Sequence, residues 1–164
     1  MNDLRFLSPS RCEAGTTSSP LRRALEDTPE QLRDLSLEGV VEVRGVLDRV
    51  EARDGEELVR LSPRRGYLFT GDDPADVAAR LREAGVLAYD ATGALAGLAL
   101  EGAQLMRRLT DLELDNLPAA GPFARVNALV LRDGGERFRV YVPQELGHDT
   151  ALAVLDALAG LEHA

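Results

Sequence analysis

The chain contains no lysine, isoleucine or tryptophan, and its only cysteine is Cys12. Without lysine there can be no Walker A phosphate loop, no Schiff-base chemistry and no lysine general base. A single cysteine cannot form an internal disulfide, and a free thiol fits a reducing cytoplasm. Two isolated histidines, His148 and His163, offer no zinc-ligand spacing. The sequence therefore excludes several common enzyme classes and any scaffold built on disulfides.

Long apolar runs are also missing. The apolar stretch near the start is too short and too polar for a signal peptide, and no segment has the length of a membrane span. The formal net charge is −9, and the acidic residues are spread along the chain. Nucleic acid and anionic lipid require clustered cations, whereas the arginine pairs 22–23, 64–65 and 107–108 are scattered. We therefore expect a cytoplasmic protein, from a GC-rich bacterium by its composition, that binds neither nucleic acid nor membranes.

The chain has 164 residues, a length that suits one domain or two small lobes that share a core. Residues 1–19 are rich in Ser, Thr, Gly and Pro, so we predict a flexible polar arm followed by a single domain over residues 20–164. Ser19-Pro20 has the pattern of a helix start. Thr28-Pro29 repeats this pattern, with Gln31 placed to complete a capping box.

The remaining pattern alternates strands with helices. Helices are predicted to begin at Asp73, Gly102 and Asp149, and Asp54-Gly55 is predicted to be a hairpin turn. From residue 66 to 131 the order is β-α-β-β-α-β, which is the order of a ferredoxin-like split βαβ core. We therefore predict an α+β fold with additional N-terminal strands and a C-terminal helix. The predicted strands lie near residues 40–46, 46–53, 56–61, 67–69, 86–89, 95–100, 126–131 and 137–142.

No catalytic residue and no metal site emerges from the motifs. Asp90 with Thr92 is most simply a turn that satisfies backbone donors, and His148-Asp149 is most simply a helix N-cap with a solvated neighbour. Glu56-Glu57 has the pattern of a solvated acidic face. The stretch from Gly93 to Gly97 lacks the third glycine of a dinucleotide fingerprint and indicates close backbone packing instead. The residues alone therefore predict a binding or assembly module.

Several short segments resemble the aminomethyltransferase superfamily. Its pattern is a strand ending in an Asp-x-Ser-like turn, a second strand, a leucine-rich helix and a Leu-Pro-x-Gly-like loop. This superfamily includes the glycine-cleavage T-protein and the folate-binding domains of sarcosine and dimethylglycine oxidases. The corresponding segments here are 89–92, 98–103, 105–109 and 117–121.

Upstream segments are similar to the gamma subunit family of heterotetrameric sarcosine oxidase. They are Ser19-Pro20-Leu21, residues 58–63 and residues 67–71. The T-protein carries Asn-Asp after its leucine-rich helix and a paired aspartate in its later hairpin. Residues 109–112 and 133–138 lack both, which favours the non-catalytic gamma subunit.

This resemblance implies a non-catalytic gamma-type subunit of a sarcosine oxidase-like complex, with oxidative demethylation of sarcosine on partner subunits. The partners would be larger flavin- and NAD-binding subunits. This chain alone would bind no cofactor, and tetrahydrofolate, flavin and NAD would lie mostly on those partners. The alternative is a standalone folate- or small-molecule-binding protein of the superfamily, with its pocket near Tyr89, Asp90 and Arg125. A ferredoxin-like domain with an unrelated ligand also stays open.

Overall fold

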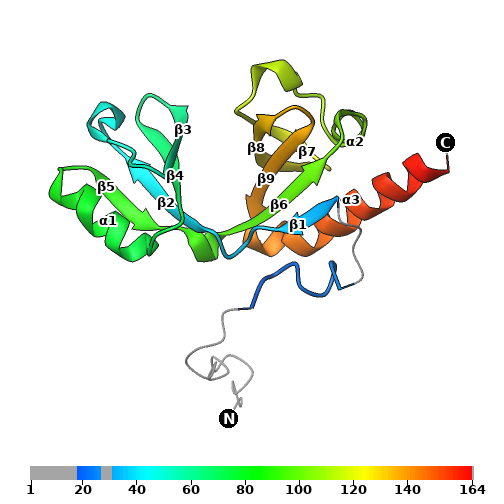
Figure 1. The fold of residues 1–164 in the computed structure, drawn as a ribbon, viewed down its shortest axis with the longest axis horizontal. Helices are drawn as coiled ribbons and strands as arrows, with labels where there is room; N and C mark the ends of the chain where they lie inside the picture. The colour runs from blue at the N-terminus through cyan, green and yellow to red at the C-terminus, as the bar shows by residue number, and fades with distance from the viewer. Residues whose placement is uncertain (1–17, 27–30, 164) are drawn as a thin grey trace, which may run out of the picture.

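The computed structural model describes residues 18–26 and 31–163, which form two lobes that meet in a V (Figure 1). Within these ranges there are nine strands and three α-helices, arranged in two antiparallel sheets. The predicted α+β class is confirmed. Among the described residues, no helix combines the length and apolarity that a bilayer crossing requires.

The small lobe comprises residues 39–90. Its sheet has the order β3-β4-β2-β5, and α1 (Pro74–Glu83) covers one face. The Asp73 carboxylate accepts a hydrogen bond from the amide of Ala75 at 2.8 Å, and Gly85 at φ +80° follows the end of the helix. The helix buries Val77, Ala78 and Leu81 against the sheet. The strands are β2 (Gly39–Arg44), β3 (Glu57–Ser62), β4 (Arg65–Thr70) and β5 (Leu87–Asp90).

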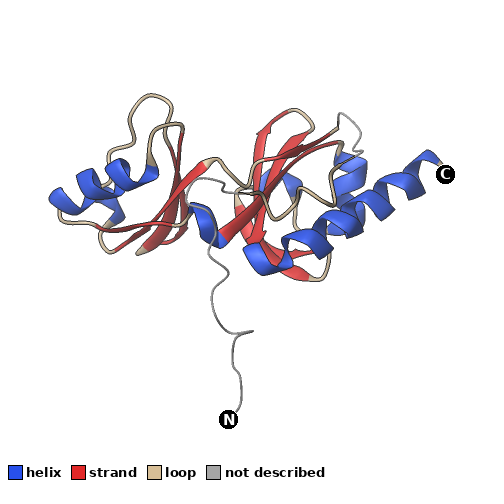
Figure 2. Ribbon diagram, turned by 90° about the horizontal axis from the view of Figure 1, so that it is seen from below, coloured by secondary structure: helices blue, strands red, loops and turns tan. Residues whose placement is uncertain are grey.

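The large lobe comprises residues 18–26, 31–35 and 95–163. Its sheet has the order β1-β6-β9-β8-β7, and α3 (Gly147–Glu162) packs on it beside α2 (Ala103–Leu109). Leu21 is fully buried and would meet any side chain added at Gly147, so the segment 18–26 lies against the start of α3. In Figure 2, α1 lies on the outer side of the small lobe and α3 runs along the large lobe toward the C-terminus. The strands are β1 (Leu32–Asp34), β6 (Leu95–Glu101), β7 (Ala119–Phe123), β8 (Val126–Gly134) and β9 (Arg137–Pro143).

Each lobe has its own apolar core, and a third cluster of buried apolar residues lies between the lobes and joins them. The rings of Phe69 on β4 and Tyr141 on β9 lie 4.6 Å apart between their centroids. The chain crosses between the lobes twice, at residues 36–38 and 91–94. Each lobe thus has its own core, and the third cluster fixes their contact. Its buried members are Leu35, Val40, Val59, Phe69, Ala91, Leu129, Leu131 and Tyr141.

The predicted ferredoxin-like core is not found, because the segment 66–131 is divided between the two sheets. β4, α1 and β5 belong to the small lobe, where β2 separates β4 from β5. β6 and α2 belong to the large lobe, and β7 intervenes before β8. β7 was not predicted because it contains Gly121 and Pro122, which are unfavourable in strands and are tolerated here at the sheet edge. Local patterns predict elements, but they do not determine which strands pair.

Several smaller predictions are wrong. Residues 20–26 form turns rather than a helix, although the hydroxyl of Ser19 accepts a hydrogen bond from the amide of Leu21 at 3.0 Å. No strand occupies 46–53, where Leu47–Arg49 is a short 3-10 helix. Accordingly, β3 pairs with the following strand β4, and Asp54-Gly55 does not link two paired strands. α3 begins at Gly147, so Asp149 lies in its first turn rather than at its N-cap.

Two predictions fall largely outside the described residues. The flexible arm over residues 1–19 is described only at residues 18 and 19, and the helix start at Thr28-Pro29 falls in the undescribed segment 27–30. Gln31 leads directly into strand β1. A single domain over residues 20–164 stays a prediction.

Candidate functional site

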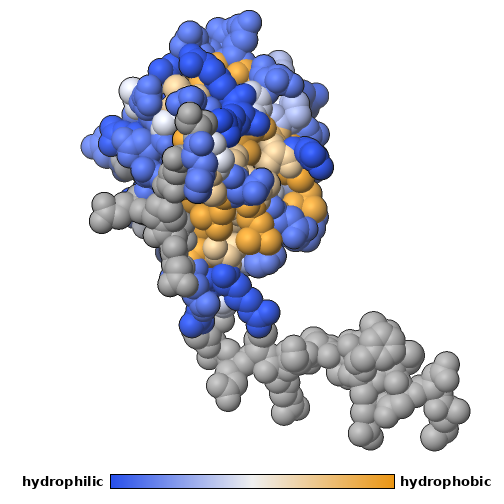
Figure 3. Space-filling view, turned by 90° about the vertical axis from the view of Figure 1, so that its right-hand side faces the viewer, coloured by the Kyte–Doolittle hydropathy of each residue, from blue (hydrophilic) through white to orange (hydrophobic). Residues whose placement is uncertain are grey.

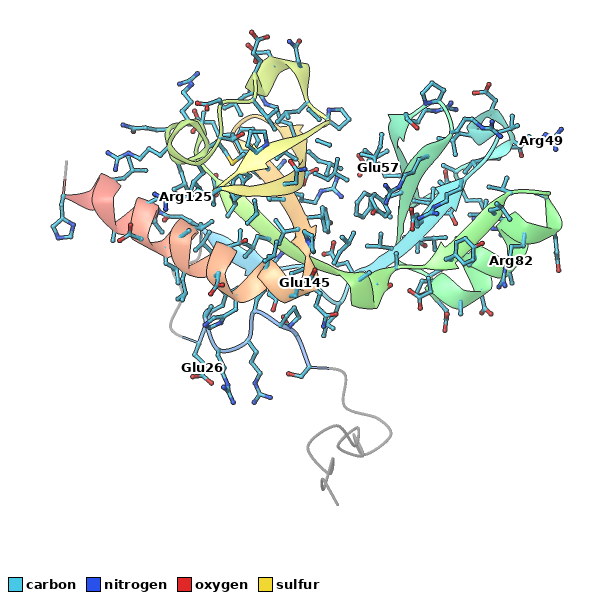
Figure 4. All side chains as sticks on the ribbon, turned by 180° about the vertical axis from the view of Figure 1, so that it is seen from behind. Glu26, Arg49, Glu57, Arg82, Arg125 and Glu145 are labelled. Atoms are coloured by element: carbon cyan, nitrogen blue, oxygen red, sulfur yellow. The ribbon has the colours of Figure 1, made fainter. Side chains whose placement is uncertain are left out.

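The three residues predicted to bind a ligand do not come together. Tyr89 lies on β5 with 52% of its surface exposed, and Asp90 ends the same strand. The Asp90 carboxylate accepts a hydrogen bond from the amide of Thr92 at 2.9 Å, as expected for a turn residue. Arg125 lies in the large lobe, exposed in the turn between β7 and β8, at the end remote from the small lobe (Figure 4). The described geometry thus offers no shared pocket for the three side chains.

The turn that carries Arg125 is strained. Phe123 pairs with Val126, so Ala124 and Arg125 form a two-residue hairpin loop with φ of 47° and 70°. Such left-handed positions are normally taken by Asn-Gly, because a Cβ atom clashes there.

We expect Arg125→Gly to raise the free energy of unfolding by about 0.5 to 1 kcal/mol, since relief of the strained φ outweighs the added chain entropy. Chemical denaturation measures this change. Arg107→Gly, within helix α2, is the control and should instead lower the free energy of unfolding by about 1 kcal/mol. Equal destabilisation by both variants would contradict the strained turn.

A cluster of polar and aromatic groups lies where the two lobes meet. A pocket of about 470 Å³ opens there, on the side of β2 and β4 that faces β9. We call it the interlobe pocket. It is lined by Leu37, Glu38, Gly39, Gly55, Glu57, Phe69, Thr70, Gly71 and Arg139.

Arg139 ties the lobes together from β9. Its Nε donates to the Asp133 carboxylate of its own lobe at 2.8 Å, and its terminal nitrogen donates to Glu57 of the small lobe. Its guanidinium carbon lies 5.5 Å from the ring centre of Phe69. Burial alone would lower the pKa of Arg139, but its hydrogen bonds to Asp133 and Glu57 outweigh burial and raise the pKa. The cation is therefore held charged and already paired. Figure 4 shows Glu57 on the small lobe, turned toward the large one.

The acidic pair Glu56-Glu57 is not the solvated face that the sequence predicts. The Glu56 side chain is only 2% exposed and forms an ion pair with Arg80 of α1. Glu57 is half-exposed and reaches Arg139 across the lobe contact. Both carboxylates thus have structural partners, and Arg139 and Glu57 are 82 residues apart in the chain. No local signal in the sequence could have paired them.

Tyr141 presents a second unusual group at the same contact. Its side-chain hydroxyl is buried and has no hydrogen-bond partner among the described residues. Burial raises the pKa of this hydroxyl to about 12, against the opposing effect of the neighbouring Arg139 cation. A buried unpaired hydroxyl costs stability, because it loses its hydrogen bonds to water without replacement.

We expect Tyr141→Phe to raise the free energy of unfolding by about 1 kcal/mol, because it removes this unpaired group and keeps the ring. Its pH dependence gives an independent check. Between pH 10 and the folded pKa of about 12, the unfolded tyrosine loses its proton first, so wild-type stability falls as pH rises. Tyr141→Phe should lack that part of the fall. If Tyr141→Phe instead lowered the free energy of unfolding at neutral pH, the Tyr141 hydroxyl would have to form a stabilising hydrogen bond.

The chemistry of the interlobe pocket suits a structural contact better than a folate. Folate carries an anionic glutamate tail, whereas the pocket presents Glu38 and Glu57. Its one lining cation, Arg139, is already bound to two carboxylates. Nor do the described residues contain a group of three or more His, Cys, Asp or Glu side chains placed to hold a metal ion.

An apolar area lies at the far end of the large lobe. Figure 3 views this end face on. There the margin of the core includes partly buried side chains of α2 and α3. Among them are Leu109, Leu155 and Leu161. The buried hydroxyl of Thr110, which directly follows α2, already donates to the carbonyl of Pro122, so this area is the outer margin of the core.

Comparison with known proteins gives a match in structure only. No protein-family model matches the chain, and no curated protein matches it in sequence. A chain of the heterotetrameric sarcosine oxidase from Corynebacterium sp. U-96, solved in complex with pyrrole 2-carboxylate, superposes with a TM-score of 0.77 at 18% identity. The superposition covers 90% of this chain and 97% of that one, so the two chains are similar in length.

Two aspartate kinase structures are more distant. The regulatory subunit of aspartate kinase from Thermus thermophilus gives a TM-score of 0.44 at 17% identity, covering 77% of this chain and 96% of that one. Aspartokinase III from E. coli, with lysine and aspartate, gives 0.40 at 14%, covering 76% and 31%. The resemblance inferred from the sequence is thus confirmed at the level of the fold: this chain has the fold of a chain of heterotetrameric sarcosine oxidase.

Proposed function

We propose that this chain is a non-catalytic, gamma-type subunit of a sarcosine oxidase-like complex in the cytoplasm. The observation that carries the proposal is the superposition along nearly the whole length of both chains, since the matched protein is a heterotetramer. In such a complex, the oxidative demethylation of sarcosine would take place on the partner subunits.

The pairing of polar groups supports a structural role. Arg139, Glu57 and Asp133 bind one another at the lobe contact, and Glu56 binds Arg80 inside the small lobe. The Arg139–Glu57 pair thus connects the two lobes, and the Glu56–Arg80 pair stabilises the small lobe internally. The acidic lining of the interlobe pocket likewise supports placing tetrahydrofolate, flavin and NAD on the partners.

Co-expression tests the proposal. The full chain is produced together with the proteins encoded beside its gene, and the complex is purified through a tag on the largest of them. We expect this chain to co-purify in fixed stoichiometry with a flavin-containing oxidase. A chain that stays monomeric, with the oxidase assembling without it, would overturn the proposal.

The alternative, a standalone folate-binding protein, is tested by calorimetry of the isolated chain with tetrahydrofolate. We expect no measurable heat of binding, because the interlobe pocket is acidic and Arg125 lies in the other lobe from Tyr89 and Asp90. Saturable binding in the micromolar range would favour the alternative. Folic acid and a pterin without the glutamate tail would then show which part of the ligand is recognised.

A further inference from the structure

One face of the small sheet is only half covered. α1 packs on the opposite face through Val41, Val43 and Ala88. On the half-covered face, Val40 and Phe69 pack against the large lobe. The next two rows across β4, β2 and β5 extend beyond that contact. Strand register places these six residues on the one face, as Tyr67, Glu42 and Tyr89 in the first row and Arg65, Arg44 and Leu87 in the second. We call these six residues the open face.

The open face carries two strongly exposed apolar side chains. Leu87 and Tyr89 are 58% and 52% exposed, and they stand two residues apart on the same strand. They account for two of the five large apolar side chains that are strongly exposed in the described part of the chain. Tyr67 continues this surface toward the lobe contact, where it packs on the third cluster. Adjacent exposed apolar and aromatic side chains on a sheet are typical of a protein interface.

The charge of the open face is opposite to that of the chain. The Nε atoms of Arg44 and Arg65 both donate to the same carboxylate oxygen of Glu42, at 2.9 and 2.8 Å. Two guanidinium groups therefore share one carboxylate, and this small surface carries a net positive charge. The whole chain has a formal charge of −9. A symmetric dimer formed through this face would bring two positively charged surfaces together, whereas an acidic surface of a different partner would be attracted.

The edge of the sheet offers a further means of attachment. β5 pairs only with β2 among the described strands, so its outer edge carries unpaired backbone groups. Natural proteins usually protect such an edge with charge or proline, but the first three residues of β5, Leu-Ala-Tyr, carry neither. Exposed apolar side chains beside an unpaired edge favour contact with another chain.

We infer that the open face is the docking surface for an acidic surface of a partner protein, with Leu87 and Tyr89 as its apolar centre and Arg44 and Arg65 as its cationic rim. The inference rests on the proposed function, because it assumes that the chain assembles with other subunits. It adds the surface through which the chain does so. Tyrosine and arginine are the residue types that contribute most to protein interfaces, so these few side chains are expected to dominate the affinity.

The test uses the co-expressed complex described above. The double variant Leu87→Ser/Tyr89→Ser should weaken the binding of this chain to the tagged oxidase about thirty-fold, as measured by surface plasmon resonance. At low salt, Arg44→Glu/Arg65→Glu should weaken the affinity for the oxidase more than Leu87→Ser/Tyr89→Ser does. Raising the ionic strength should reduce the difference between the two double variants, because salt screens the charge repulsion. Leu152→Ser on α3 and Arg33→Glu on β1 are the controls, because they change another strongly exposed leucine and a more exposed arginine elsewhere. Circular dichroism and thermal melting establish that each variant is folded.

The outcomes separate the two proposals. If the wild-type chain does not assemble with the oxidase, the proposed function fails, and this inference fails with it. If it assembles and the open-face variants bind as well as the controls, only the docking surface is wrong. Analytical ultracentrifugation of the chain alone gives the third outcome. The wild-type chain could prove to be a dimer that Leu87→Ser/Tyr89→Ser converts to a monomer. That result would show that the open face binds a second copy of the chain, and it would overturn the inference of an acidic partner.

Discussion

Replacement of Arg139 by methionine is expected to lower the free energy of unfolding by about 2 kcal/mol. The side chain is 14% exposed and satisfies carboxylates from both lobes, Asp133 in its own and Glu57 in the other. Methionine keeps much of the apolar contact but leaves both acids without their cation. The expected loss is smaller than for a fully buried pair, because both carboxylates are partly solvated. Urea denaturation followed by circular dichroism measures it.

A double-mutant cycle with Glu57→Gln isolates the part of this energy that crosses the lobe contact. We expect a coupling energy of about 1 kcal/mol between Arg139 and Glu57, at the upper end of the range for exposed pairs. Arg60 and Asp48 provide the control, since their side chains are 47% and 84% exposed. Arg60→Met should cost under about 0.5 kcal/mol. Similar losses for Arg60→Met and Arg139→Met would mean that Arg139 does not hold the lobes together.

Gly97→Ala is expected to lower the free energy of unfolding by about 2 kcal/mol. A Cβ atom built at Gly97 would lie 2.7 Å from the Tyr141 ring and 3.0 Å from the Cβ of Leu35. Both neighbours are buried at the lobe contact, so neither can move freely. Adding a methyl group to such a packed site forces the ring and the strand apart. Thermal and urea unfolding would both report the change.

Gly93→Ala is the matched control, because no heavy atom beyond its own chain neighbours lies within 4 Å of the position that its Cβ would take. Its effect should stay within about 0.5 kcal/mol. The two glycines lie four residues apart, in a stretch whose sequence predicts close backbone packing. The structure confirms that prediction for Gly97 and not for Gly93. Equal effects of the two substitutions would contradict the tight contact with Tyr141.

Local sequence signals identified most elements where the chemistry is local. α1 was predicted with its cap, because Asp73, Pro74 and Gly85 each act on the backbone within a few residues. β8 and β9 also lie where strands are predicted, near 126–131 and 137–142, and Gly134 and Gly135 at positive φ form the turn between them. Elements without such signals were missed. β1 has only three residues and forms through pairing with β6, which lies far along the chain.

Strand pairing and the candidate site depend on contacts between distant residues, and they could not be predicted. The sequence from 66 to 131 has the element order of one ferredoxin-like sheet. The short turn at Thr92–Ala94 instead directs β6 to the large lobe. The interlobe pocket combines Phe69 with Arg139 and Glu57. These residues are far apart in the sequence, and no motif links them. The residues chosen by resemblance, Tyr89, Asp90 and Arg125, are divided between the lobes. Tyr89 reappears only in the open face, with a different proposed role.

The small lobe is inserted between two paired strands of the large lobe, and the chain enters and leaves it at the two crossings. β1 and β6 are antiparallel neighbours, yet the whole small lobe lies between them in sequence. Its ends are held together where the amide of Ala91 donates to the carbonyl of Val40 at 2.8 Å. Closing so long a loop in the unfolded chain is entropically costly, and a folded small lobe removes most of that cost. We therefore expect the small lobe to form early and to act as the turn that brings β1 onto β6.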